Sequence, residues 1–442
     1  MEPDRWRGPN AGVGVAIISE PVVPEVGATV IPSLRSNFKW MSAGNVFYVT
    51  CQWGMLSILA KAGNASVVGQ YVLGLAISAP VFMFTNLNLR AVQATDARSD
   101  FEFADYFTLR ILASLAGVLT VAVVSLSLNY DVGTRLVIFL LGVAKAIESL
   151  GDVVAGLLQR IERIHQVAIS LVFRGTLSLG AFGITYLVLR NLTAAVCALV
   201  LSWSIVFVAY DLKCAAGALR DGERFLRFMP GTLRRLAVLS APLGVVMALI
   251  SLNTNVPRYI LARTLGDAKL GIFASLGYVL QAQYLVINAM GDSASARLAR
   301  MFSLGDARGF RRVIDKLVWI GVGVLVLGTM LAALFGRPLL TLLYRPEYAQ
   351  RLSVFVVMVA AGGLASIGYF LGYGINAARH FRLQVPMIGL ATLTTAALTA
   401  VLAPRFGLMG AAAALLCGTL VHAVGNGLAL RYAFGQILPQ KR

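Results

Sequence analysis

The stretch Gly63-Asn-Ala-Ser-Val-Val-Gly-Gln-Tyr71 has a counterpart about 200 residues later, in Gly266-Asp-Ala-Lys-Leu-Gly-Ile-Phe273. A second pair of strings follows in the same order, Asp96-Ala-Arg-Ser-Asp-Phe101 and Asp306-Ala-Arg-Gly-Phe310. In both halves of the chain the first string precedes an apolar run and the second string follows it. Matched strings in the same order, at equivalent positions, indicate an internal duplication of the kind found in transporters built from repeats.

The composition around these strings is that of a membrane protein. Of the 442 residues, 58% are hydrophobic and 13% are charged, whereas a soluble domain has about 45 to 50% apolar and about 25% charged residues. A membrane-spanning helix needs roughly 20 apolar residues. Runs of that length occur at 40–60, 67–89, 107–128, 135–157, 168–189 and 192–212, and again at 236–256, 270–291, 313–335, 352–373, 384–403 and 408–430.

We therefore predict an all-α polytopic membrane protein with about 12 transmembrane helices in two six-helix bundles, at 36–212 and 236–432. A cytoplasmic linker with an amphipathic helix joins the bundles over 213–235, where arginines alternate with apolar residues. Residues 1–35 are predicted to be a disordered cytoplasmic tail, and 433–442 a second cytoplasmic tail. Because six crossings return the chain to its starting side, both halves have the same orientation, and a cavity is expected between them.

The positive charge of the chain follows from its predicted orientation in the membrane. The net charge is +18, and 27 of the 38 Lys and Arg residues are assigned to the side of the N-terminus, Arg110 near the start of its apolar run among them, against 10 assigned to the other side. Basic residues accumulate on the cytoplasmic side, so both termini are predicted to be cytoplasmic. Without a globular basic face, nucleic acid is not an expected partner. The three histidines and four cysteines form no metal-binding motif, so no metal is predicted.

Charges inside the apolar runs mark the candidate site, because a charge at the bilayer centre costs at least about 2.5 to 3.5 kcal/mol. Lys145, Glu148 and Asp152 follow the spacing i, i+3, i+7 and share one helix face, and Arg174 lies in the next run. In one interpretation, Lys145 and Arg174 bind a lipid diphosphate, while Glu148 or Asp152 takes up a proton or a sodium ion. In the other, two ion pairs, Lys145 with Glu148 and Asp152 with Arg174, fix the helix packing.

The second half offers polar candidates for contacts with substrate. Asn253, Asn255 and Arg258 lie around the helix-breaking Pro257 and are candidate contacts for a sugar or a diphosphate, although an arginine near the interface can also reach lipid phosphates. Gln281 and Gln283 are candidate substrate contacts, or they form interhelical hydrogen bonds. His422 is a candidate ion-coupling residue or a packing contact. The cations Arg90, Arg379 and Arg382 either attract an anionic headgroup or are ordinary cytoplasmic charges.

Three segments carry a family resemblance: Ala62–Pro80, its counterpart Leu265–Phe273, and Phe406-Gly-Leu-Met-Gly-Ala-Ala412. They resemble the polysaccharide biosynthesis transporters, which include the O-antigen flippases, within the superfamily that also holds the multidrug and toxin extrusion (MATE) antiporters. The resemblance covers about residues 36–432. It implies a MATE-like flippase that moves undecaprenyl-diphosphate-linked oligosaccharide units across the bacterial inner (plasma) membrane by alternating access, for O-antigen or exopolysaccharide synthesis.

The resemblance implies a transporter without catalytic residues or a bound cofactor, with coupling to a proton or sodium gradient as an option. The implied partners are a lipid-linked oligosaccharide and anionic membrane lipids, with a polysaccharide polymerase and a chain-length regulator as candidates. Two other functions stay open. A cation-coupled drug antiporter of the same fold would favour an acidic, aromatic cavity, and a membrane polysaccharide polymerase would need a larger external loop than the outside connections near 257–269 and 336–351.

Overall fold

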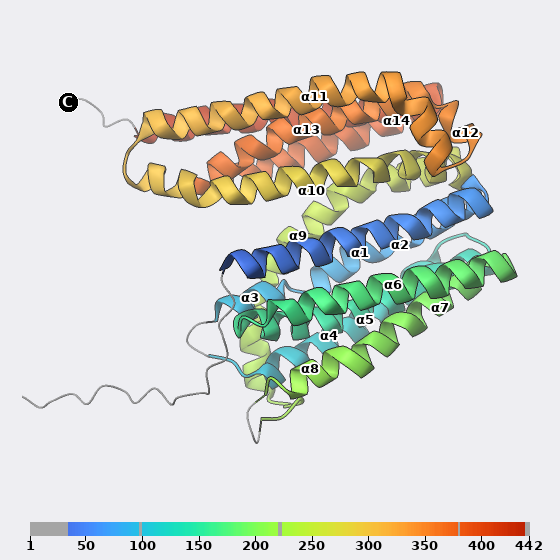
Figure 1. Cartoon of the computed structure of the whole chain (residues 1–442), viewed down its shortest axis with the longest axis vertical. Coiled ribbons are helices and arrows are strands. Elements are labelled where there is room, and N and C mark those ends of the chain that lie inside the picture. Colours follow the sequence, from blue (N-terminus) through green and yellow to red (C-terminus); the bar gives the residue numbers. More distant parts are fainter. Residues whose placement is uncertain (1–33, 97–99, 220–222, 379–380, 438–442) are drawn as a thin grey trace, which may run out of the picture.

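The computed structural model describes residues 34–96, 100–219, 223–378 and 381–437, and every regular element in these ranges is helical. Figure 1 shows two stacks of roughly parallel rods. One stack holds helices α1 to α8, which we call the first half; the second half comprises α9 to α14, and α9 runs obliquely between the two stacks. The start of α1 and the end of α14 lie at the same end of the bundle, here called the tail end, and the opposite end is the far end.

The helices have the following bounds. The first half contains α1 (Leu34–Ala62), α2 (Ala65–Thr85), α3 (Leu89–Thr95), α4 (Phe103–Ser127), α5 (Val132–Arg160), α6 (Ile164–Leu189) and α7 (Leu192–Val206), which continues through a π-helical turn, η1 (Phe207–Asp211), into α8 (Leu212–Ala216). The second half contains α9 (Pro230–Leu265), α10 (Asp267–Ser303), α11 (Ala307–Leu343), α12 (Pro346–Ala349), α13 (Leu352–Ala377) and α14 (Phe381–Ile437), which bends sharply at Gly407.

Two of the repeated strings cap helices. Asn64 Oδ1 accepts a hydrogen bond from the amide of Val67 (3.0 Å) and caps α2, while Asp306 Oδ1 accepts one from Gly309 (2.8 Å) and caps α11. Short polar side chains at these positions satisfy amides that the first helical turn leaves unpaired. One copy of each string therefore caps a helix, whereas the counterpart Gly266 makes no side-chain cap of α10 and the counterpart Asp96 ends α3.

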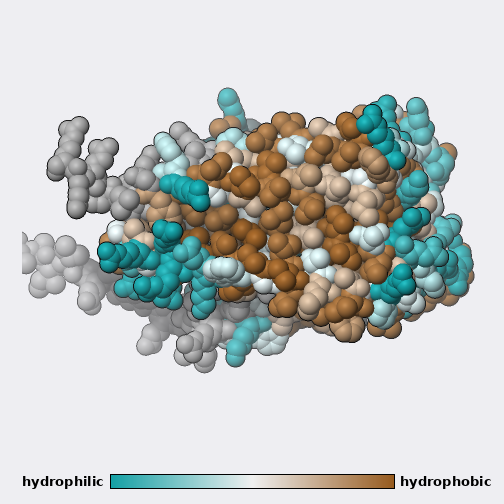
Figure 2. All heavy atoms as spheres, turned by 90° about the horizontal axis from the view of Figure 1, so that it is seen from above, coloured by the Kyte–Doolittle hydropathy of each residue, from teal (hydrophilic) through white to brown (hydrophobic). Residues whose placement is uncertain are grey.

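The surface has the character expected in a bilayer. Eight helices in the described ranges are long and apolar enough to cross a membrane, and Figure 2 shows a broad hydrophobic band between hydrophilic ends. Large apolar side chains such as Val123, Leu126 and Trp319 are about two thirds exposed or more (67%, 70% and 72%) within the chain itself, which lipid would cover. The protein is thus a multi-pass membrane protein; the number of about twelve spans and the side of the termini stay predictions.

The predicted run at 67–89 is interrupted. Helix α2 ends at Thr85, and Leu87 and Asn88 adopt left-handed backbone conformations (φ 49° for both) before α3 begins. Asn tolerates this conformation better than other residues with a side chain. The turn redirects the chain so that Arg90, at the start of α3, lies against α5 and contacts Asp152.

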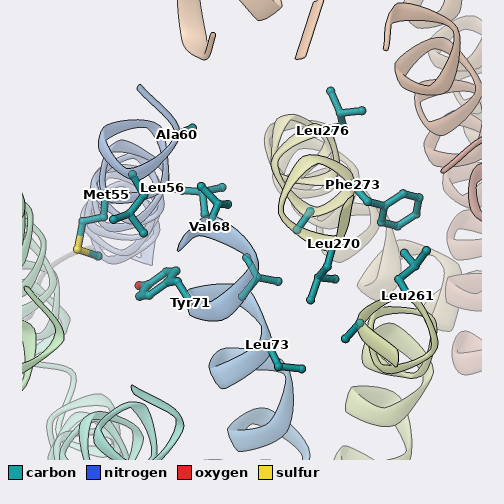
Figure 3. Close-up of a cluster of buried hydrophobic side chains, with 14 of the residues drawn as sticks. Met55, Leu56, Ala60, Val68, Tyr71, Leu73, Leu261, Leu270, Phe273 and Leu276 are labelled. Carbon is teal, nitrogen blue, oxygen red and sulfur yellow. The ribbon is translucent and has the colours of Figure 1, made fainter. Parts of the chain in front are cut away.

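The halves meet closely at the far end, where α2 crosses α10. A Cβ atom on Gly69 would overlap the backbone of Asp267, and one on Gly271 would overlap the backbone of Ala65. Glycine is therefore required at both positions, because only a helix surface without side chains allows such an approach. Figure 3 shows the apolar cluster around this crossing, with Leu56 and Val68 from the first half and Leu270 from the second.

Two hydrogen bonds add to this closure of the far end. Trp53 Nε1 donates to Tyr344 Oη (2.9 Å), and Arg345 Nε donates to the carbonyl of Lys61 (3.0 Å). All these contacts join the ends of α1 and α2 to the second half. The far end is therefore the closed side of the junction between the halves.

The linker differs from its prediction. Residues 223–229, the part described before α9, are not helical. Phe225 packs edge-on against Phe103 (5.9 Å between ring centroids) and Phe107 (6.1 Å), and Arg227 forms an ion pair with Glu102 (2.5 Å). The predicted amphipathic helix is wrong here, because the aromatic rings of α4 offer the linker a protein surface to pack on in place of lipid.

Candidate functional site

The polar centre of the first half is a cavity of about 150 Å³ between α1, α2, α5 and α7, closed on one side by Tyr278 of α10. Lys145 Nζ lies 2.6 Å from Glu148 Oε2, and Tyr48 donates a hydrogen bond to Glu148 Oε1 (3.2 Å). The i, i+3 spacing on α5 places the first two side chains on one face, as predicted. Because Tyr278 belongs to the second half, this ion pair lies where the two halves meet.

Arg174 has a different partner from the one expected. It forms a buried ion pair with Asp211, not with Asp152, and Ser170 also donates to Asp211 (2.6 Å). Asp211 is the last residue of the π-helical turn η1, which directs its side chain at α6. Sequence analysis missed it because it lies at the end of an apolar run; a carboxylate inside such a run was the available signal.

Asp152 contacts two arginines on the tail-end side of the cavity. Arg90 Nη1 lies 3.1 Å from Asp152 Oδ1, and Arg110 Nη2 lies 3.5 Å from Asp152 Oδ2. Arg110, on α4, is completely buried, and its Nε and Nη1 atoms have no hydrogen-bond partner among the described residues. Sequence analysis treated Arg110 as a cytoplasmic loop charge, so its burial beside Asp152 is a correction.

The charges of the first half are thus grouped in three sites along one path. Lys145 with Glu148, Arg174 with Asp211, and Asp152 with two arginines bring together four cations and three carboxylates. Buried charges persist only when paired, and removal of one partner costs about 3 to 5 kcal/mol. Within these three sites the cations exceed the carboxylates by one, whereas the buried Asp105 of α4 is a further carboxylate outside them.

The second half encloses a larger cavity, of about 620 Å³, between α9, α10, α13 and α14. Three residues from the sequence prediction line it: Arg258, Gln283 and His422. Gln283 Nε2 donates to Ser366 Oγ (3.2 Å), which is the interhelical hydrogen bond considered above. His422 lies 3.1 Å from the amide nitrogen of Asn426, one turn along α14, which also donates to the carbonyl of Gly368.

Four of the predicted site residues have side chains outside the described residues, and a fifth does not line the cavity. The side chains of Asn253, Gln281 and Arg382 lie outside the described residues, as does Arg379 altogether. Asn255 is described and buried; it bonds to Ser251 and Arg258 and does not face the cavity. The roles of all these residues stay predictions, and no group of three or more metal-ligating side chains occurs in the described ranges.

Comparisons with known proteins identify the fold of the chain. No protein-family profile matches the chain. An inward-facing MATE family multidrug resistance transporter of the MOP superfamily aligns with a TM-score of 0.70 and 12% identity, covering 91% of this chain and 96% of that one. A mutant of the Vibrio cholerae MATE transporter VcmN aligns with a TM-score of 0.60 and 13% identity, covering 90% and 96%. The chain has the fold of the MATE transporters.

A curated relative adds the biological context. The capsular polysaccharide biosynthesis protein CapF of Staphylococcus aureus is 27% identical over 382 residues, which cover 85% of this chain and 94% of that protein. Together with the MATE fold, this match confirms the resemblance to polysaccharide transporters of the MOP superfamily. The chain is thus a multi-pass membrane protein with the fold of MATE transporters, and it is similar to a capsular polysaccharide biosynthesis protein.

Proposed function

We propose that this MOP transporter is a flippase for lipid-linked oligosaccharides in surface polysaccharide synthesis. The observation that carries the proposal is the set of cations beside the two cavities: the three ion-pair sites contain four cations and three carboxylates, and Arg258 is the one charged residue among the described residues that line the second cavity. A diphosphate linked to a lipid is an anion that such cations attract. The relation to a capsular polysaccharide biosynthesis protein supports the same substrate class.

The Lys145–Glu148 ion pair can exchange its carboxylate for an anionic substrate and re-form after the substrate leaves, as transport requires. A diphosphate that reaches Lys145 competes with Glu148 for the ammonium group, which is now 2.6 Å from the carboxylate. A proton or sodium ion then neutralises the released Glu148, so that the charge of the site stays balanced while the substrate crosses. Release of the substrate on the other side restores the ion pair and displaces the ion.

The direction of access follows from the closed far end. Because α2 and α10 are in backbone contact at the far end, we infer that substrate enters from the tail end, which is the predicted cytoplasmic side. Arg90, half-buried beside Asp152, lies on this route and is the first cation that a headgroup from the inner leaflet meets. The proposal therefore describes a carrier waiting for substrate on the cytoplasmic side.

The two rival functions lack a supporting feature. A drug antiporter for cations would use carboxylates in its large cavity, and among the described lining residues of the 620 Å³ cavity there is none. A polymerase would carry a substantial external domain, whereas the connections at the far end between described helices run from one residue (Gly266) to eight (344–351).

The decisive experiment is leaflet-specific labelling of the lipid-linked repeat unit in a strain that lacks the gene. We expect intact units to accumulate in the inner leaflet and surface polysaccharide to be lost, with recovery by the wild-type gene but not by Lys145→Ala. Lys269→Ala, which removes an exposed lysine at the start of α10, is the matched control and should restore transport fully. Accumulation of single units in the outer leaflet, or normal polysaccharide in the deletion strain, would refute the proposal.

A further inference from the structure

The 620 Å³ cavity of the second half has the size and form of a small-molecule site. Its volume lies within the range of about 300 to 1,000 Å³ typical of ligand pockets. Residues with little or no side chain, among them Gly277, Ala361 and Gly362, line one part of it. A Cβ on Gly362 would lie 3.1 Å from Gln283 Oε1, so this glycine leaves room beside a polar group.

Another part of the cavity is an aromatic wall formed by three helices. Tyr284 of α10 and Tyr369 of α13 meet edge to face (4.8 Å between ring centroids), and Tyr369 meets His422 of α14 in the same way (5.6 Å). These rings combine an apolar face with a polar tip. Sugars present the complementary surface, with apolar C–H faces and hydroxyl edges.

Arg258 differs from the other buried cations described above. Lys145, Arg174 and Arg110 each have a carboxylate within 3.5 Å. Arg258 lines the cavity, and the partner the structure gives it in the described ranges is the neutral Oδ1 of Asn255 (3.0 Å). Asn255 is itself buried and held by a hydrogen bond to the carbonyl of Ser251 (2.8 Å). The guanidinium is therefore positioned by a neutral group, and no carboxylate among the described residues pairs with it.

A cavity-lining guanidinium without a carboxylate partner among the described residues is a receptor for one anionic group. Arginine has five N–H donors in a planar fork, and a carboxylate accepts two of them in parallel. A diphosphate carries more negative charge than one arginine balances, and the proposed function assigns it to the first half. A carboxylate on a sugar ring fits both the single charge of Arg258 and the aromatic wall.

We propose that the second-half cavity binds the glycan of the substrate and that Arg258 selects glycans containing a carboxylate, of the hexuronic acid class. This inference rests on the proposed function and specifies its substrate. The lipid diphosphate then binds in the first half while the sugar rings occupy the second, so each half recognises a different part of one molecule. Selectivity resides in Arg258, which Asn255 orients.

The test is a binding measurement on the purified full-length protein in lipid nanodiscs with two soluble probes of equal length. Hyaluronan tetrasaccharide contains glucuronate, and chitotetraose has no carboxylate. We expect the wild type to bind the acidic probe about tenfold more tightly or better, as for a charge-assisted hydrogen-bonded pair. Arg258→Gln should abolish the preference, Arg258→Lys should restore part of it, and Arg263→Gln, an exposed arginine on the same helix, should leave it unchanged.

Further arms locate the site and separate the two proposals. Gly277→Leu, which fills the cavity, should weaken both probes, because its Cβ already approaches Met358 (3.4 Å). Equal binding of both probes by the wild type, an unchanged preference in Arg258→Gln, or no binding of either probe would overturn the inference. Competition by inorganic diphosphate that depends on Arg258 would also overturn it and assign this arginine to the diphosphate. The leaflet assay reads flipping independently, so either proposal can fail alone.

Discussion

The two halves of the chain share the repeated strings and meet at the far end, but their interiors are unlike. The first half contains several buried cations, each with a carboxylate, around a cavity of about 150 Å³. The second half contains a cavity of about 620 Å³ with an aromatic wall and one arginine without a carboxylate. A duplicated backbone can thus divide recognition into two tasks: exchange of charge in one half and recognition of sugar rings in the other.

The largest predicted effect is a loss of stability when a buried ion pair of the first half is broken. Asp211→Ala leaves Arg174 buried and unpaired, and the free energy of unfolding should fall by about 3 to 5 kcal/mol. Thermal unfolding of the purified protein in detergent measures this loss. The control is Asp315→Ala, which removes an exposed partner of Arg311 and should change stability by less than about 1 kcal/mol. Equal effects of the two substitutions would show that the buried pair contributes no more to the free energy of unfolding than the exposed pair.

The next prediction concerns the crossing of α2 and α10, to which both halves contribute. Gly69→Val places a side chain against the backbone of Asp267, and overpacking of this kind costs about 1 to 3 kcal/mol. The closed far end should become at least about tenfold less populated, and transport in the leaflet assay should fall with it. Labelling of a cysteine introduced near the far end reports the opening. Gly323→Val, at a glycine with no neighbour within 4 Å, is the control; unaltered labelling in Gly69→Val would argue against a gate at this crossing.

A third prediction sharpens the role of the cavity in the first half. Glu148→Gln keeps the shape of the side chain but cannot release or take up an ion, so transport should no longer respond to a proton or sodium gradient. The remaining Lys145 then binds inorganic diphosphate about tenfold more tightly, because its carboxylate competitor is gone. Gradient-driven transport in vesicles and diphosphate binding measure the two effects. Glu347→Gln, at the far-end helix α12, is the control; a gradient response preserved in Glu148→Gln would remove this carboxylate from coupling.

The smallest predicted effect concerns the residue that holds Arg258. Asn255→Ala removes one hydrogen bond, worth about 1 kcal/mol, and should lower the preference for the glucuronate probe by about fivefold while the charge remains. Binding of the two tetrasaccharides measures it. Thr264→Ala, at an exposed threonine on the same helix, should have no effect. A loss as large as that of Arg258→Gln would mean that Asn255 contacts the sugar itself.

Local patterns predicted much of this molecule, and long-range packing explains the errors. The repeated strings and apolar runs located the helices, and the pairing of Lys145 with Glu148 was one of the two interpretations that the sequence left open. The partner of Arg174 was missed because Asp211 lies 37 residues away on a π-helical turn, whose geometry a 3.6-residue period does not represent. Arg110 was taken for a loop charge because its burial depends on α5 and not on its own segment.

The second cavity could not have been found from the sequence. Its lining comes from four helices that are separated by up to about 170 residues, and most of it is small or apolar and therefore indistinguishable from ordinary membrane-helix surface. Gln283 and His422 were candidates because they are polar in apolar runs, but the aromatic wall between Tyr284 and Tyr369 carried no polar signal. What the sequence lacked was the spatial arrangement that separates a lining residue from a packing residue.

The crossing of α2 and α10 also bears on the ancestry of the chain. Gly69 and Gly271 occupy equivalent positions in the two copies of the repeated string, and each approaches the backbone of the other copy. The contact is therefore reciprocal, as in the interface of a symmetric homodimer. An ancestral six-helix protein could have built the same junction from two identical subunits before gene fusion. Fusion would then have freed each interior to diverge, while the shared glycines stayed bound by a contact that neither copy can change alone.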